Sequence, residues 1–241
     1  MSFELVLTYL ISPAFFRGAL ITLLITVCSL CFGALTGLVI ALLQETRSRA
    51  AHGVTLAYLW LFRGTPVLFQ IIFVYNVLPS FGIRLSAVVC AVLALSLNEG
   101  AYMAEIIRSG LQAIKKGQRT AALALGMFPI DVMRHVVIPQ ALRIILPPVG
   151  NQMIGMLKLS ALVSVVAVED LLLVANQTAS SSFRYFEALS AAGIYYLVLT
   201  TLFMALQALI ERRLDPKSRR KRMAAPLAER LLGIGRASTV R

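Results

Sequence analysis

The longest apolar block without a charge in the sequence covers residues 18–43. As a helix these 26 residues would be about 39 Å long at about 1.5 Å per residue, enough to cross a hydrocarbon core about 30 Å thick. The whole chain is 59% apolar and 14% charged, whereas about 25% of the residues of soluble domains are charged. The sequence therefore predicts a membrane protein and excludes a soluble globular domain.

Further apolar blocks cover residues 54–78, 85–107, 144–168 and 188–210. We predict an all-α membrane protein with about five transmembrane helices and a helical cytoplasmic loop between the third and fourth. The expected organisation has three parts: a periplasmic N-terminal segment, a transmembrane domain and a basic cytoplasmic tail, over residues 1–16, 17–210 and 211–241.

Local residue choices refine the spans. Thr65 can cap a helix and Pro66 suits its first position, so the second span is expected to bend or break there. Gly33 and Gly37 have the spacing that lets another helix approach closely. The pair Pro147-Pro148 is expected to open the fourth span.

The distribution of Lys and Arg predicts the orientation. Eighteen of the 23 basic residues fall in the loops after spans one and three and in the tail, which makes that face cytoplasmic. The N-terminus is then outside. The tail is expected to contact anionic membrane lipids, and a nucleic-acid role is the disfavoured alternative. All three cysteines lie inside apolar blocks, so the sequence supports neither a disulfide framework nor a metal site.

The cytoplasmic loop, about residues 112–140, is patterned as two short helices. Residues 118–125 favour a helix, Gly126 suits the left-handed residue that ends it, and Pro129 suits the first turn of the next helix, which Pro139 is expected to stop. Exposed apolar side chains in such a loop indicate a binding surface. The alternative is that they lie on the bilayer or against the chain's own spans.

The loop residues carry a resemblance. The runs around Ala121-Ala122, Gly126-Met127 and Ile138-Pro139-Gln140-Ala141 resemble the "EAA" loop of bacterial ABC importer permeases, in the polar amino-acid branch with a MetI-like membrane domain. Segments 62–66, 100–106 and 158–170 match signatures of the same branch, and the resemblance covers about residues 17–213. Thr120 stands where the family usually has the glutamate that names the loop.

The resemblance implies a function and partners. The chain would be the permease of an ATP-driven amino-acid importer in the bacterial inner membrane, with Thr120, Ala121, Ala122, Gly126, Met127 and Pro139 forming the coupling loop. Two ATPase subunits, a second permease copy or paralogue, and a periplasmic solute-binding protein would be its partners. Independently, no lysine follows a glycine as a P-loop requires, so ATP and Mg²⁺ are expected on the partner, with no cofactor and no catalysis here.

Two charges inside the spans predict a substrate path. Glu99 and Lys158 are expected to bracket the membrane midplane, where opposite charges would suit a zwitterionic amino acid. The alternative is a Glu99–Lys158 bridge that only stabilises packing. Tyr102 and Ser160, in the matching segments, complete the candidate path.

Arg63, with Thr65 and Pro66, is expected near the cytoplasmic end of span two, as a membrane anchor or an inner gate. A rival function is an ion-coupled carrier or channel that uses Glu99, Glu105 and Lys158 as a relay. That function leaves the patterned loop unexplained.

Overall fold

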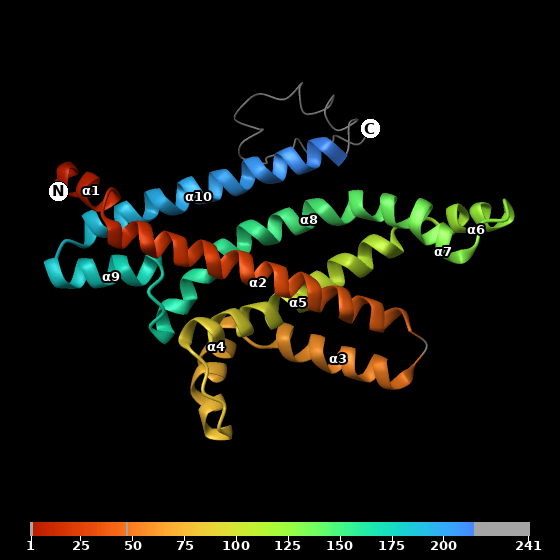
Figure 1. Ribbon diagram of the computed structural model, residues 1–241, viewed down its shortest axis with the longest axis horizontal. Helices are drawn as coiled ribbons and strands as arrows, with labels where there is room; N and C mark the ends of the chain where they lie inside the picture. The colour runs from red at the N-terminus through yellow and green to blue at the C-terminus, as the bar shows by residue number, and fades with distance from the viewer. Residues whose placement is uncertain (1, 47, 215–241) are drawn as a thin grey trace, which may run out of the picture.

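The computed structural model describes residues 2–46 and 48–214, and within these ranges the chain is helical with no strand. Four of its helical segments are long and apolar enough to cross a membrane, and the count is five when a bent helix pair is taken as one span. The helices form an elongated bundle (Figure 1). At one end lie α1 (Phe3–Leu10) and α9 (Leu171–Ser182), and at the other lie α6 (Lys116–Ala124) and α7 (Pro129–Asp131). The expected fold class is confirmed.

The first span is longer than predicted. Helix α1 covers Phe3–Leu10, and α2 covers Pro13–Glu45 with Pro13 in its first turn. The segment 1–16 is therefore mostly helical and contains the start of the first span. A proline fits at this position because the first helical N–H groups have no acceptor within the helix.

The second span is broken as predicted. Helices α3 (Arg49–Gly64) and α4 (Val67–Val77) meet at an angle of 104°. A short 3₁₀ helix, η1 (Leu78–Phe81), follows. Helix α3 begins at Arg49, five residues before the predicted start of this span, so the break lies about 22 Å along the helix from the α2–α3 turn. In Figure 1, α4 points away from the long axis of the bundle.

Helix α5 (Ala87–Gln112) packs along α2 through the predicted glycines. A Cβ atom added to Gly33 would lie 2.7 Å from Cβ of Glu99. One added to Gly37 would lie 2.5 Å from Cβ of Met103. The α2–α5 approach therefore depends on the absence of side chains at these positions.

The loop folds as α6 (Lys116–Ala124), after which Gly126 takes a left-handed φ of 83°, as predicted. The next helix starts at α7 (Pro129–Asp131) and continues through the π-helical turn η2 (Val132–Val137) into α8 (Ile138–Leu159) and the 3₁₀ segment η3 (Ser160–Val166).

Two proline predictions are therefore wrong. Pro139 lies inside the continuous helix, directly after the π-helical turn, whose longer hydrogen-bonded ring relieves the usual clash with the preceding turn. Pro147 and Pro148 lie within α8 and do not begin it. Membrane helices tolerate internal prolines where neighbouring groups satisfy the freed backbone atoms.

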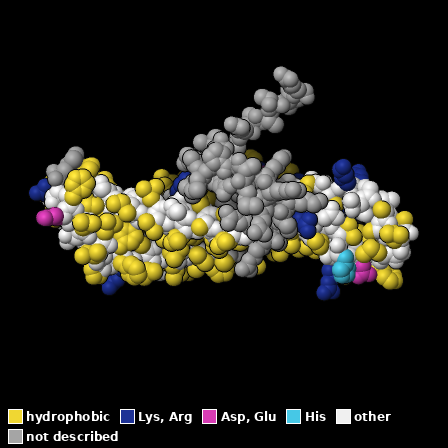
Figure 2. Space-filling view, turned by 90° about the horizontal axis from the view of Figure 1, so that it is seen from above, with side chains coloured by type: hydrophobic (Ala, Val, Ile, Leu, Met, Phe, Trp, Pro, Cys, Tyr) yellow, Lys and Arg dark blue, Asp and Glu magenta, His cyan; other side chains and the backbone are white. Residues whose placement is uncertain are grey.

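The chain closes with α9 (Leu171–Ser182) and α10 (Tyr185–Leu214). Helix α9 packs on α2 and α10, and together with α1 it forms an apolar cluster at the end of the bundle opposite α6. Figure 2 shows hydrophobic side chains over much of the described surface, with charges gathered mainly toward the two ends. The predicted tail beyond Leu214 lies outside the described residues.

Candidate functional site

Helix α6 is held against the ends of two spans. Ala122 is buried in a cluster with Ile114 of the α5–α6 linker, Val137 of η2 and Ala141 of α8. The guanidinium of Arg119 donates a hydrogen bond of 3.2 Å to the backbone carbonyl of Leu111 in α5. The loop is therefore a structured extension of α5 and α8.

The outer side of this loop is apolar and exposed. We call it the loop patch; Leu125 is 83% exposed, and its members are Leu123, Leu125, Phe128, Ile130 and Met133. Thr120 is also exposed, and its hydroxyl donates to the carbonyl of Lys116. Of the other predicted loop residues, Ala121, Gly126 and Pro139 are exposed and Met127 is half-buried. Val137, another apolar residue of the predicted loop, is fully buried.

Glu99 and Lys158 do not form an ion pair. Glu99 is 2% exposed, and its two carboxylate oxygens accept hydrogen bonds of 3.2 and 3.3 Å from the amide of Gln152 in α8. Lys158 is exposed and has no ion-pair partner within the described part of the chain. The alternative of a bridge between these two residues is thus wrong.

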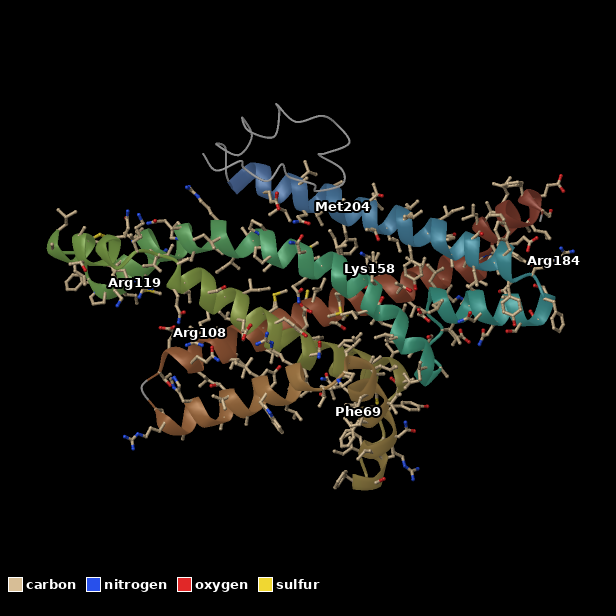
Figure 3. All side chains as sticks on the ribbon, turned by 180° about the vertical axis from the view of Figure 1, so that it is seen from behind. Phe69, Arg108, Arg119, Lys158, Arg184 and Met204 are labelled. Atoms are coloured by element: carbon tan, nitrogen blue, oxygen red, sulfur yellow. The ribbon has the colours of Figure 1, made fainter. Side chains whose placement is uncertain are left out.

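Lys158 lies on an open face of α8. Asn151, Gly155 and Lys158 are spaced i, i+4 and i+7, and a Cβ atom at Gly155 would meet nothing within 4 Å. Figure 3 places Lys158 between Arg119 at one end of the molecule and Arg184 at the other. Ser160 does not share this face, since it is buried and its hydroxyl donates to the carbonyl of Leu157. The sequence analysis missed Asn151, although a polar residue within a span is a signal of function.

The break between α3 and α4 is tied to α5. Arg63 forms an ion pair with Glu105, and its guanidinium lies 5.6 Å from the ring centre of Tyr102. Arg63 therefore contacts the neighbouring helix α5 through the Glu105 carboxylate and the Tyr102 ring. The rival relay of Glu99, Glu105 and Lys158 is separated here, because each has a different partner or none among the described residues.

Two amides that the sequence analysis missed satisfy the backbone at this break. The Gln70 amide donates to the carbonyls of Phe62 and Thr65 and to the Thr65 hydroxyl. The Asn98 amide donates to Phe62 and to the Gln70 side-chain oxygen. Their signal in the sequence was again a polar side chain inside an apolar block.

These features define a multi-spanning helical membrane protein with a rigid loop on one end. Residues 33–216 match the family model of the binding-protein-dependent transport system inner membrane component. The chain belongs to this family and is a transport subunit of the inner membrane.

Curated relatives match over most of their length. The arginine transport system permease protein ArtQ of Bacillus subtilis is 37% identical, over 84% of this chain and 93% of that protein. The glutamine transport system permease protein GlnP of Escherichia coli is 36% identical over the same shares. The arginine transport system permease protein ArgU of Corynebacterium glutamicum is 35% identical, over 92% of this chain and 74% of that protein.

Solved structures agree on the fold. The crystal structure of an amino acid ABC transporter with histidines has a chain that is 41% identical, with a TM-score of 0.82 over 88% of this chain and 99% of that one. The MetNI methionine ABC transporter, at 21% identity and a TM-score of 0.71, shares the fold.

Proposed function

We propose that this chain is the permease of an importer that moves polar amino acids, driven by ATP hydrolysis on separate subunits. The loop patch carries this proposal: it is a rigid, exposed apolar surface that residues 2–46 and 48–214 leave uncovered. Its relatives are named for arginine and glutamine transport, which supports these two amino acids as the first substrates to test.

The proposed assembly has two permeases, two ATPase subunits and a periplasmic binding protein. Six basic residues lie between positions 108 and 143, in the loop around α6 and beside it, which supports a cytoplasmic position for that end of the bundle and an external N-terminus. The exposed face of α8 around Lys158 supports a path completed by a second permease. Closure of the ATPase pair would shift the loop and rock the spans, as in alternating access.

The test uses the assembled complex in proteoliposomes. The binding protein is supplied on the side of the vesicle membrane opposite the α6 end of the complex. Labelled L-arginine and L-glutamine should accumulate only with ATP on the α6 side. A carrier, by contrast, would continue uptake after ATP depletion at constant membrane potential. That outcome would overturn the proposal.

A variant pair tests the loop patch. Leu125→Asp should uncouple the complex, because a charged side chain would replace an apolar contact on the ATPase. Gln112→Asp, at an exposed position at the end of α5, is the matched control and should retain uptake. Equal uptake and ATP hydrolysis in both variants would remove the patch from coupling.

A further inference from the structure

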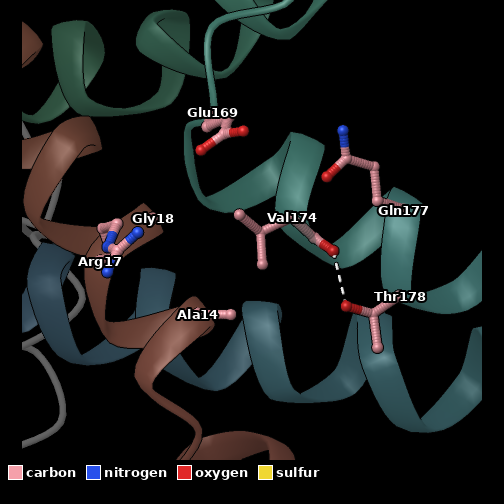
Figure 4. A pocket seen from close by; sticks show the side chains of 7 residues that line it. All are labelled: Ala14, Arg17, Gly18, Glu169, Val174, Gln177 and Thr178. Atoms are coloured by element: carbon pink, nitrogen blue, oxygen red, sulfur yellow. Dashed lines mark hydrogen bonds between the residues drawn. The ribbon is translucent and has the colours of Figure 1, made fainter.

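A cavity of about 240 Å³ lies at the end of the bundle opposite the loop patch. It sits between α2 and α9, as Figure 4 shows, and is bordered by the linker that precedes α9. The residues that line it are Ala14, Arg17, Gly18, Glu169, Val174, Gln177 and Thr178. It is separate from the face of α8 that carries Lys158.

Two opposite charges border this cavity. Arg17 comes from α2 and Glu169 from the linker, and both side chains are exposed. Within the described residues neither forms an ion pair, with the other or with a third group. An unpaired cation and an unpaired anion on one concave surface can bind the two charged ends of a single small ligand.

The base of the cavity is fixed by close packing. A Cβ atom on Gly18 would lie 3.0 Å from Cα of Leu171, so the α2 and α9 backbones are nearly in contact there. The backbone N–H of Leu171 also donates to the Thr22 hydroxyl at 3.1 Å. Asp170 is fully buried and caps α9, which leaves Glu169 as the carboxylate that faces the cavity. The two charges are thus held on a rigid frame.

We propose that this cavity binds a free zwitterionic amino acid, with its α-carboxylate at Arg17 and its α-ammonium at Glu169. A volume of about 240 Å³ is below that of drug-sized pockets, which begin near 300 Å³, and suits a ligand of this size. Val174 offers an apolar wall, and Gln177 offers an amide to a polar substrate side chain. The inference rests on the proposed function, since it takes polar amino acids as substrates and this end as external.

The test is protection of a thiol placed in the cavity wall. Gln177→Cys is introduced into a variant with Cys28 and Cys31 changed to serine, and the complete complex in nanodiscs is labelled with a hydrophilic maleimide. L-Arginine or L-glutamine at twice its dissociation constant should slow labelling about threefold, by simple occupancy. Agmatine, which lacks the carboxylate of arginine, should not protect.

Charge variants identify the contacts. Arg17→Gln and Glu169→Gln should each abolish protection. Glu4→Gln removes an exposed carboxylate at the same end but outside the cavity, and it should leave protection unchanged. Protection that persists in Arg17→Gln and Glu169→Gln would overturn the proposal.

Two other results would also overturn it. Protection by the loaded binding protein alone, without any from free amino acid, would assign the cavity to protein docking. Unchanged labelling under every condition would show that no amino acid binds there. ATP-driven uptake by the same preparation separates the two proposals. Uptake without protection of the thiol would overturn only the proposed cavity site. The absence of any amino-acid uptake would overturn the proposed function.

Discussion

The side-chain amide of Asn98 donates a hydrogen bond of 2.9 Å to the backbone carbonyl of Phe62. In an uninterrupted α-helix that carbonyl would accept from residue 66, but Pro66 has no N–H. Asn98 and Gln70 replace the missing donor. The break in the second span is therefore stabilised by a side chain from the third.

Asn98→Leu should destabilise the protein by about 1–3 kcal/mol, because it removes a donor from the Phe62 carbonyl and from the side-chain oxygen of buried Gln70. Thermal unfolding in detergent measures the effect. Asn76→Leu is the control, since Asn76 is exposed and bonds only within its own helix. Equal midpoints for the two variants would contradict this prediction.

Gly37→Ala should cost about 1–3 kcal/mol by overpacking the contact between α2 and α5. The added methyl would lie 2.8 Å from the backbone nitrogen of Ala104, which cannot move as a flexible side chain can. Gly53→Ala adds the same atom where nothing lies within 4 Å. Unfolding midpoints of the two variants are compared, and a larger loss at Gly53 would refute the packing account.

Gly126→Ala should weaken the α6–α7 turn by about 1–2 kcal/mol, because a left-handed backbone disfavours a Cβ atom. The space around Gly126 is open, so conformational strain is the sole expected cause. Under the proposed coupling role, less substrate should be moved per ATP hydrolysed. Gly117→Ala is the control, because Gly117 lies in helix α6 with open space around it, and it should keep the normal ratio of substrate moved to ATP hydrolysed. The same normal ratio in Gly126→Ala would argue against a rigid coupling turn.

Lys158→Met should lower uptake of a carboxylate-bearing substrate about tenfold or more, since charged hydrogen bonds contribute about 1.5–3 kcal/mol. Lys158→Arg keeps the charge and should restore most uptake. Initial uptake rates and the unfolding midpoint are measured together. A Met variant with normal uptake would place Lys158 outside the substrate path.

Asp170→Ala should cost about 0.5–2 kcal/mol, because the carboxylate caps α9 by accepting from the N–H groups of Leu172 and Leu173. Asp170→Asn keeps an acceptor and should cost less. Burial raises the pKa of Asp170, although these N–H groups oppose the shift. The stability of the natural protein relative to Asp170→Asn should therefore fall as pH rises from about 4 through the raised pKa. A natural protein that gains stability relative to Asp170→Asn as pH rises over this range would contradict this sign.

The spans and the broken helix were predictable because their causes are local. Uninterrupted hydrophobicity identifies the membrane helices, and Pro66 alone removes a helix donor. The left-handed backbone at Gly126 could be predicted in the same way, since glycine is the residue type that favours this conformation.

The partners of the polar side chains could not be read from the sequence. Glu99 bonds to Gln152, 53 positions away, and only tertiary packing brings them together. For the same reason the sequence left open the alternative of a Glu99–Lys158 bridge, which the structure does not contain among its described residues. The prediction that Pro139 ends a helix was wrong for a related reason. A π-helical turn accommodates a proline that local rules treat as a helix stop.

Residues Pro129–Val166 form one continuous helical segment. Ile130 and Met133 of the loop patch lie in its first turns, and Lys158 lies near its other end. The π-helical turn near its start and the pair Pro147-Pro148 within it are the places where this helix can bend. Under the proposed function, a displacement of Ile130 would therefore be carried to Lys158 through one helix, and stiffening or loosening these bends would change how far Lys158 moves.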